Sequence, residues 1–261
     1  MTSFVARILI VGMGVVGTNL HNELGQWGCC VDKYKSKYYD NYLRVTKNNE
    51  HFDLAFICVD TPADEDITCD VSEVMASLIE YNADIFVIKS TVLPHKLEML
   101  QEYNPHIIFS PEYYGHTQHC NNYDYDFTIL GGNQADCIKV QQILQHVYDA
   151  RHKFIVTDIK TASLAKYMEN AYLAMKVSFC NQFFDIAEQA GVPYEELREL
   201  FLLDPRVNPS HTFVYRDKPY WDSHCLNKDV PAIAEEYDAQ LLKDMITFNE
   251  SRKPKEDQKH E

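Results

Sequence analysis

The glycine-rich turn at Gly12, Gly14 and Gly17 constrains the fold most, because of what stands on either side of it. The apolar run 7–11 (RILIV) precedes the turn and is typical of a strand buried in a parallel sheet. A helical pattern follows, and a second β-rich run, 29–31, ends at Asp32, twenty positions after the first glycine. A strand, a GxGxxG turn, a helix and an acidic residue after the next strand together indicate a dinucleotide-binding unit.

Each glycine of this turn has a predicted role. Gly12 allows the tight turn, Gly14 lets a pyrophosphate approach the backbone, and Gly17 lets the helix pack closely on the strand. Val15 and Val16 stand between the last two glycines. We therefore expect all five residues to bind the cofactor.

The residues around Asp32 predict which dinucleotide is bound. A carboxylate at this position accepts hydrogen bonds from the adenosine ribose hydroxyls and repels a 2′-phosphate, which favours NAD over NADP. The neighbouring cations Lys33 and Lys35 soften that preference. We include Lys33 among the expected cofactor-binding residues.

Strands and helices continue to alternate as far as residue 156. Apolar strand-like runs at 53–59, 85–88, 106–109, 127–130 and 154–156 are interspersed with helical patterns at 71–81, 94–103 and 136–148. This alternation predicts an α/β fold with a doubly wound parallel sheet, in which ligands gather beyond the carboxyl ends of the strands. At those ends stand Thr61, Pro62, Ser90, Thr91 and Glu112.

The stretch 161–191 contains no proline and no internal glycine, and it predicts one long helix. Its large apolar residues recur at steps of three and four, which predicts one buried face. They are Leu164, Met168, Tyr172, Met175, Phe179, Phe183 and Ile186. Lys166 and Asn170 stand four apart and side by side, a pairing that by itself is typical of a solvated surface.

A small helical domain is expected around this helix, with a shorter helix over 192–203 and a last one over 233–248. Cys225 is predicted on a loop before a helix N-terminus, near Lys228 and Asp229. A helix N-terminus and a cation both favour the thiolate, so Cys225 is a candidate nucleophile. The predicted domains are 1–158, an NAD-binding Rossmann domain, and 159–248, followed by a charged, disordered tail over 249–261.

Composition narrows the partners and the compartment. A formal net charge of −15 argues against nucleic acid or an anionic membrane as the partner. No apolar run is long enough to span a bilayer, and the N-terminus lacks a signal-peptide pattern. The eight cysteines show no metal-binding spacing, so we expect a reduced, cytoplasmic protein without a metal.

Taken in order, the motifs resemble those of the UDP-glucose/GDP-mannose dehydrogenase family. After the glycine turn come VDTP (59–62), KSTV (89–92), SPEY (110–113), KYMEN (166–170), DPRV (204–207) and CLNKD (225–229). The resemblance covers about residues 6–245. It implies an N-terminal NAD domain, a central helical domain and a homodimer formed through the long helix. It also implies a nucleotide sugar as substrate, in the synthesis of polysaccharide precursors.

The family converts a primary alcohol into a carboxylate with two NAD⁺. Carried over by motif, Cys225 would capture the intermediate aldehyde as a thiohemiacetal and then hold a thioester. Glu112, with Thr91 nearby, would assist the water that hydrolyses the thioester.

Three further residues complete the implied machinery. Lys166 and Asn170 would hold the developing oxyanion from one helix face. Asp229 would orient water or share a proton with Lys166 as the base of the first oxidation. The cofactor is expected to contact Thr61, Pro62, Ser90, Thr91 and Lys228.

The sequence departs from the family pattern in three places. The family has a third domain that clamps the nucleotide, whereas only some thirty residues follow Asp229 here. The family's Gly-Gly-Ser-Cys is replaced by DSHC (222–225), so side chains stand where backbone would approach the sugar. His116 replaces the family's second acidic residue. These departures affect the substrate assignment more than the reaction type.

The expected function is therefore NAD-dependent oxidation of the hydroxymethyl group of a nucleotide sugar through a Cys225 thioester. Two alternatives stay open. One is a single two-electron oxidation of the kind hydroxyacid dehydrogenases perform, which use the same two-domain plan. The other is an inactive NAD-binding relative that serves as a regulatory or assembly subunit.

Overall fold

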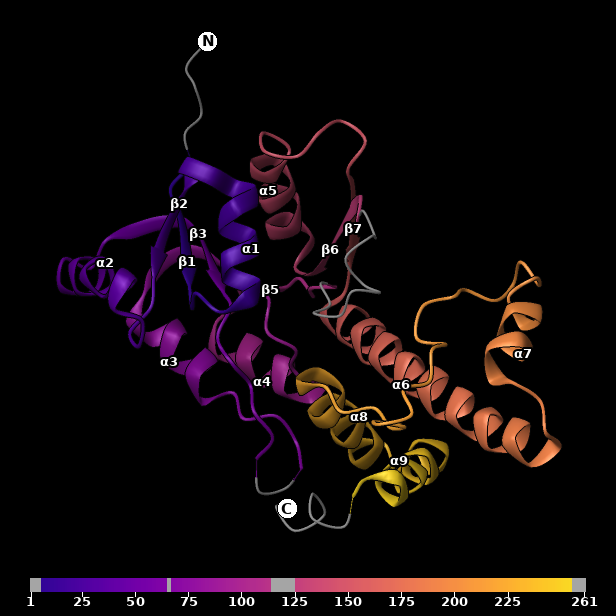
Figure 1. Cartoon of the computed structure of the whole chain (residues 1–261). Coiled ribbons are helices and arrows are strands. Elements are labelled where there is room, and N and C mark those ends of the chain that lie inside the picture. The colour runs from indigo at the N-terminus through magenta and orange to yellow at the C-terminus, as the bar shows by residue number, and fades with distance from the viewer. Residues whose placement is uncertain (1–5, 65–66, 114–124, 255–261) are drawn as a thin grey trace. The chain divides into compact units, whose positions relative to one another are not determined.

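The computed structural model describes residues 6–64, 67–113 and 125–254, which form two compact units (Figure 1). Among the described residues, the first unit contains 6–62, 69–113 and 125–166. The second contains 63–64, 67–68 and 167–254. The change from one unit to the other after Lys166 falls inside a single helix, α6 (Ile159–Ala190).

The first unit is a seven-stranded sheet with the strand order β2-β1-β3-β4-β5-β6-β7. This confirms the predicted doubly wound α/β architecture, with a topological switch point between β1 and β3. The strands are β1 (Ile8–Val11), β2 (Gly28–Val31), β3 (His51–Ile57), β4 (Asn82–Ile88), β5 (Ile107–Phe109), β6 (Phe127–Gly132) and β7 (Lys153–Thr157).

The sheet is not parallel throughout, and in this respect the prediction was wrong. β6 pairs antiparallel with β5, through Ile108 opposite Gly132, while β6 and β7 are parallel to each other. A parallel connection needs a crossover, usually a helix. The sequence between residues 109 and 127 carries no helical pattern, so the alternation that predicts a parallel sheet is interrupted there.

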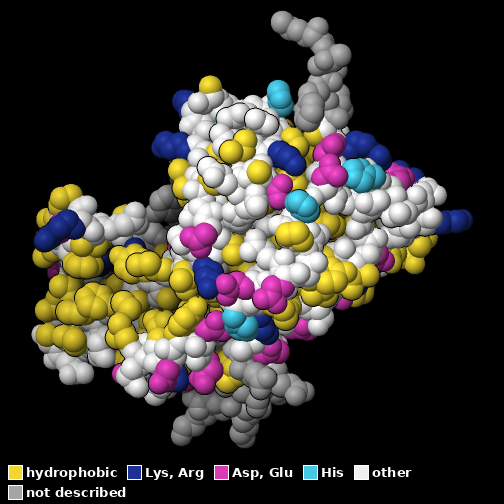
Figure 2. All heavy atoms as spheres, turned by 180° about the vertical axis from the view of Figure 1, so that it is seen from behind, with side chains coloured by type: hydrophobic (Ala, Val, Ile, Leu, Met, Phe, Trp, Pro, Cys, Tyr) yellow, Lys and Arg dark blue, Asp and Glu magenta, His cyan; other side chains and the backbone are white. Residues whose placement is uncertain are grey.

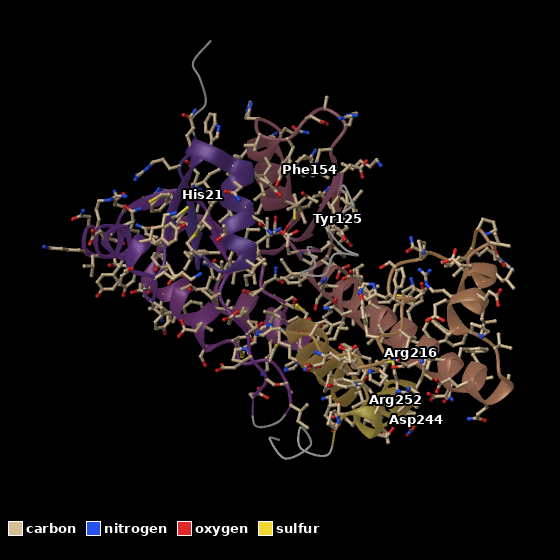
Figure 3. The ribbon with its side chains drawn as sticks, in the orientation of Figure 1. His21, Tyr125, Phe154, Arg216, Asp244 and Arg252 are labelled. Carbon is tan, nitrogen blue, oxygen red and sulfur yellow. The ribbon has the colours of Figure 1, made fainter. Side chains whose placement is uncertain are left out.

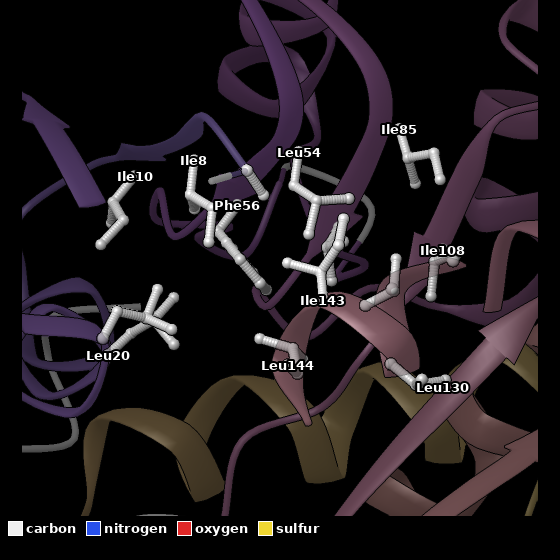
Figure 4. Close-up of a cluster of buried hydrophobic side chains, with 14 of the residues drawn as sticks. Ile8, Ile10, Leu20, Leu54, Phe56, Ile85, Ile108, Leu130, Ile143 and Leu144 are labelled. Carbon is white, nitrogen blue, oxygen red and sulfur yellow. The ribbon is translucent and has the colours of Figure 1, made fainter. Parts of the chain in front are cut away.

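The core of the first unit lies between the sheet and its helices. All four residues of β1 are buried, and apolar side chains from α1 and α5 pack on the central strands (Figure 4). The helices of this unit are α1 (Val15–Leu24), the short 3₁₀ helix η1 (Gly25–Trp27), α2 (Ser36–Lys47), α3 (Ser72–Glu80), α4 (Pro94–Tyr103) and α5 (Gln134–Leu144).

The turn from β1 to α1 leaves no space for side chains at two glycines. Gly12 has φ +84°, and a Cβ there would lie 2.7 Å from the carbonyl oxygen of Cys58 on the neighbouring strand connection. A Cβ on Gly17 would lie 2.0 Å from the carbonyl oxygen of Gly12. These contacts fix how closely α1 approaches the end of β1.

The second unit is built on α6 with α7 (Tyr194–Phe201), α8 (His224–Glu236) and α9 (Gln240–Arg252). Ala174 of α6 packs with Trp221, Leu226, Val230 and Met245. A second cluster joins α6 to α7 through Cys180, Phe184, Ala187 and Tyr194.

Two predictions for the C-terminal part were wrong. The expected helix over 233–248 is two helices, separated at Asp238, which has φ +48°. Residues 249–252, assigned to the tail, continue α9. Asn249 is 1% exposed and exchanges hydrogen bonds with the backbone of Trp221. Arg252, which Figure 3 labels, forms a double ion pair with Asp185.

The exposure of the large apolar residues of α6 also contradicts the prediction that they form a buried face. Met168 is 77% exposed, Tyr172 58% and Phe179 48%, and only Met175 of the predicted stripe packs on a core. The buried face carries mostly smaller residues such as Ala174 and Ser178, which let neighbouring elements approach closely. Figure 2 shows hydrophobic side chains gathered over the part of the surface formed by α6 and α7.

None of the described helices is long and apolar enough to cross a bilayer. Within the same residues, His, Cys, Asp and Glu side chains do not gather in groups of three or more that could hold a metal ion.

The glycine turn can be tested by adding one methyl group at either of two positions. Gly17→Ala should lower the free energy of unfolding by at least about 2 kcal/mol, because the new Cβ collides with a backbone carbonyl. Gly14→Ala is the matched control, since a Cβ there has no neighbour within 4 Å, and it should cost less than about 1 kcal/mol. Urea unfolding measures both values, and equal losses would contradict this account of the turn.

Candidate active site

The start of α1 is a candidate phosphate-binding site on the first unit. Gly14 is the N-cap residue and supplies no side-chain cap, so the first N–H groups of α1 have no acceptor within the helix. Gly14 is exposed, and the space where its Cβ would stand is open. Free N–H groups at the positive end of a helix dipole fit a diphosphate, and Val15 and Val16 belong to this first turn.

Asp32 is buried directly after β2 and is held by three backbone amides. Its Oδ2 accepts from the N–H of Met13 at 2.9 Å, and its Oδ1 accepts from Tyr34 and Lys35 at 2.9 and 3.0 Å. A carboxylate offers about four acceptor positions, so one remains for a ribose hydroxyl. The residues of the turn and Asp32 therefore fit an adenosine diphosphate moiety.

The two cations beside Asp32 are engaged elsewhere. The Lys33 ammonium lies 2.6 Å from a carboxylate oxygen of Glu73, and the hydrogen bond to Glu73 raises the pKa of Lys33. Lys35 donates to the carbonyl oxygen of Met13 at 2.5 Å. Both ammonium groups thus have acceptors within the protein.

The polar residues beyond β3 and β4 fix the ends of those strands. Thr61 donates its hydroxyl hydrogen to the carbonyl oxygen of Thr91 at 2.8 Å, and Ser90 donates to that of Val59. The carbonyl oxygen of Pro62 accepts from Asp70 at 2.7 Å. Since the hydroxyl hydrogens of Thr61 and Ser90 are used internally, these two hydroxyls can offer a ligand only acceptor capacity.

Glu112 follows β5 and forms an ion pair that the sequence analysis missed. The ammonium of Lys89, at the end of β4, lies 3.1 Å from Oε2 of Glu112 and donates to Oγ of Ser110 at 3.3 Å. Lys89 is only 8% exposed. The sequence signal for Lys89 is its position directly after β4, beside Ser90 and Thr91.

Lys166 is the last predicted site residue of the first unit. It is 8% exposed, and its ammonium stands 4.8 Å from the ring centroid of Tyr113, directly after Glu112 in sequence. A cation over an aromatic face is stabilised by the ring quadrupole. Lys166 is therefore a buried cation rather than a solvated one, and a buried cation suits the electrostatic role that the resemblance implies.

In the second unit, three predicted residues are brought into direct contact. Asp229 is 1% exposed, and its Oδ2 accepts from Nδ2 of Asn170 at 2.7 Å. Its Oδ1 lies 2.6 Å from the ammonium of Lys228. A buried carboxylate with both oxygens hydrogen-bonded is fixed in orientation.

Cys225 is exposed and lies in the first turn of α8 rather than on the loop that was predicted. Ser223 caps this helix by accepting from the N–H of Leu226. Cys225 and Asp229 are four residues apart on α8 and therefore lie on the same face of the helix. By contrast, burial raises the pKa of the Cys58 thiol to about 12, which makes Cys58 a poor nucleophile.

The side chains that replace the family's glycines have local partners. Asp222 binds the ammonium of Lys218 at 2.7 Å and accepts from Asn227 at 2.7 Å, and these contacts lower the pKa of Asp222. Asp222 and Ser223 therefore order the approach to α8 where glycines would leave it open. His116 lies outside the described residues.

Comparison with known proteins identifies the family. Residues 28–152 match the NAD binding domain of the UDP-glucose/GDP-mannose dehydrogenase family, and residues 160–251 match its central domain. The chain belongs to the UDP-glucose/GDP-mannose dehydrogenase family. The first match begins at residue 28, so the glycine turn itself is supported by the structure rather than by that match.

Curated members of the UDP-glucose/GDP-mannose dehydrogenase family are longer than this chain. UDP-glucose 6-dehydrogenase of Rickettsia felis is 28% identical over 85% of the chain and 54% of its own length. UDP-N-acetyl-D-mannosamine dehydrogenase of Methanocaldococcus jannaschii is 26% identical over 80% of the chain and 51% of its own length. The chain thus spans about half the length of these relatives.

Solved structures show the same fold. A UDP-glucose dehydrogenase from Pyrobaculum islandicum matches 96% of this chain and 69% of its own, with a TM-score of 0.71 at 19% identity. A 3-hydroxyisobutyrate dehydrogenase from Mycobacterium tuberculosis matches 95% of this chain and 94% of its own, with a TM-score of 0.68 at 15% identity.

The ion pair between Lys89 and Glu112 predicts energetic coupling. Lys89→Met should lower the free energy of unfolding by about 2–3 kcal/mol, because the half-buried carboxylate loses its cation. Glu112→Gln should cost a similar amount, and the double variant should cost clearly less than the sum, as urea unfolding would measure.

Lys139→Met is the matched control for this cycle. Its ammonium is 3.7 Å from Asp136 on a side chain that is 62% exposed, so its loss should change stability by less than about 1 kcal/mol. Additive losses at Lys89 and Glu112 would show that the pair is not coupled.

Proposed function

We propose that this protein oxidises the hydroxymethyl group of a nucleotide sugar to a carboxylate, with NAD as the hydride acceptor. The observation that carries the proposal is the arrangement on α8. An exposed Cys225 stands one helical turn before Asp229, whose carboxylate is held by Asn170 and Lys228. NAD binding by the glycine turn and Asp32 requires neither the accessible thiol of Cys225 nor the buried carboxylate of Asp229.

The cofactor is NAD in this proposal. Gly12, Gly14 and Gly17 shape the turn, and Asp32 keeps one acceptor position for a ribose hydroxyl. When bound, NAD supplies the hydride acceptor for both oxidations. A buried carboxylate at Asp32 repels a 2′-phosphate, which disfavours NADP.

The second oxidation needs a covalent intermediate. The Cys225 thiolate adds to the aldehyde carbon to give a thiohemiacetal, and loss of a hydride converts this adduct into a thioester. Water then adds to the thioester carbon, and the C–S bond breaks to release the carboxylate and the free thiol. In sum, one alcohol, two NAD⁺ and one water give one carboxylate, two NADH and three protons.

The remaining residues have distinct proposed roles. Lys166 and Asn170, one turn apart on α6, stabilise the oxyanion that forms when the thiolate or water adds to a carbonyl. Asp229 fixes Asn170 and takes part in proton transfer. Glu112, with Thr91, assists the attacking water, and the ammonium of Lys89, 3.1 Å from Oε2 of Glu112, orients the carboxylate for that role.

A homodimer through α6 is part of the proposal. The exposed stripe on α6, which includes Met168, Tyr172, Phe179, Phe183 and Ile186, is the kind of apolar surface that a second copy of the chain would cover. The resemblance to the family, in which this helix forms the dimer contact, favours the same arrangement.

A single two-electron oxidation is the second candidate. It is favoured by the 3-hydroxyisobutyrate dehydrogenase structure, which the chain matches over 94% of that protein's length. A catalytic Lys–Asn pair on the long helix would serve that reaction without Cys225. The third candidate function is that of a non-catalytic subunit that binds NAD.

Stoichiometry separates these functions. With saturating NAD⁺ and a panel of nucleotide sugars and simple hydroxyacids, we expect two NADH per molecule of nucleotide sugar. Cys225→Ser should lower the rate of complete oxidation by at least about a thousandfold, since the nucleophile is lost. Cys180→Ser, which changes a buried thiol of the same unit, is the control and should retain activity.

One NADH per turnover, unchanged in Cys225→Ser, would establish the single oxidation instead. NAD binding without NADH from any substrate would establish the non-catalytic subunit.

The dimer is tested by a charge on the exposed stripe. The protein should sediment at about twice its chain mass of 30.3 kDa, and Phe179→Glu should shift it to the monomer because a buried charge opposes association. Ile79→Glu, at an apolar residue of α3 that is 66% exposed, should leave the dimer intact. A natural chain that sediments as a monomer would contradict the proposed interface.

A further inference from the structure

A second concave site lies in the first unit, at the edge of the sheet opposite the glycine turn. The pocket has a volume of about 480 Å³ and is lined by residues at the amino ends of β1, β2 and β3, together with η1 and α2. This volume falls within the range of small-molecule sites, about 300–1,000 Å³. The lining residues are Ala6, Arg7, Ile8, Gln26, Trp27, Gly28, Cys29, Arg44, Glu50 and Phe52.

The pocket is separate from the proposed cofactor site. β1 runs from the pocket at Ile8 to the glycine turn after Val11, and four residues of strand span roughly 13 Å. In doubly wound α/β folds, ligands bind beyond the carboxyl ends of the strands. This pocket lies at the amino ends, so it is not the ligand site that the fold leads one to expect.

The residues that line the pocket carry a net positive charge, whereas the chain as a whole is acidic. Arg7 and Arg44 each donate to one carboxylate oxygen of Glu50, so two guanidinium groups share a single carboxylate. The lining therefore carries one surplus positive charge, although the whole chain carries a net charge of −15. Such a local surplus favours an anionic ligand.

The guanidinium groups keep hydrogen-bond capacity for such a ligand. Arg7 uses one terminal nitrogen for Glu50, and Arg44 uses its second terminal nitrogen for the Sγ of Cys29 at 3.4 Å. Their remaining N–H groups have no acceptor among the described residues. Because Glu50 orients both guanidiniums, a carboxylate or phosphate group would meet donors that are already positioned.

Two aromatic residues, Trp27 and Phe52, are among those that line the pocket. Trp27 is half-buried and also packs on the core, and Phe52 is 2% exposed. The guanidinium of Arg7 lies 5.0 Å from the ring centroid of Phe52. An indole that is held on one side and accessible on the other is suited to stack on a planar ring.

We propose that this pocket binds a small aromatic anion, with its ring against Trp27 and its single carboxylate or phosphate group on Arg7 and Arg44. The site is independent of the proposed oxidation, because none of its residues belongs to the proposed catalytic or cofactor-binding set.

Calorimetric titration of the natural chain tests the proposal with two probes, indole-3-acetate and uridine monophosphate. At least one should bind with saturation at one site. Inorganic phosphate, which lacks a ring, and uridine, which lacks the anion, should bind at least tenfold more weakly than the ring-bearing anions.

Substitutions locate the bound probe. Arg44→Gln should weaken its binding at least tenfold, and Arg7→Gln, at a side chain that is 55% exposed, provides a second variant should the first fail to fold. Arg151→Gln removes an 88% exposed guanidinium elsewhere in the unit and should change affinity less than twofold. In a Trp221→Phe chain, where Trp27 is the sole tryptophan, uridine monophosphate should quench the fluorescence if titration shows that it binds.

Saturating NAD should leave the affinity of the probe unchanged within twofold. The proposal would be overturned by displacement of the probe by NAD, by binding that Arg44→Gln and Arg7→Gln leave unchanged, or by the failure of both probes to saturate.

Discussion

The continuity of α6 is the constraint that fixes the spacing of Lys166 and Asn170 along one helix. In the first unit, Ser163 donates to the carbonyl oxygen of Val92 at 2.7 Å, which ties the start of the helix to the end of β4. In the second unit, Ala174 packs against α8. Between these anchors the helix holds Lys166 and Asn170 one turn apart. A proline there would cost about 3 kcal/mol and break that spacing.

The sheet could be predicted because its signals are local. The glycine turn, the apolar strands and Asp32 each follow from the geometry of a few consecutive residues. The antiparallel direction of β6 could not be predicted. It depends on how β6 pairs with β5, and the segment between these strands has no helical pattern that would indicate a crossover. The break between α8 and α9 was missed because Asp238 adopts a positive φ, which its residue type permits but does not require.

The types of the site residues could be predicted, but their contacts could not. Asp229 meets Asn170 across 59 residues of sequence, and Lys89 meets Glu112 from a different strand end. No local pattern encodes either pair.

The apolar stripe on α6 also shows what a local pattern leaves undetermined. Periodicity indicates that one helix face is apolar, but it does not say whether the chain itself covers that face, and Met168 is 77% exposed.

The central claim is that Cys225 forms a thioester during the reaction, and its most direct test is the mass of the intact protein. A Glu112→Gln chain mixed with NAD⁺ and UDP-glucose should accumulate an acyl adduct, because the step that consumes the thioester is slowed. Peptide mapping should locate the adduct at Cys225, and Cys225→Ser/Glu112→Gln should lack it. NADH formation by Glu112→Gln without any adduct on Cys225 would contradict the claim.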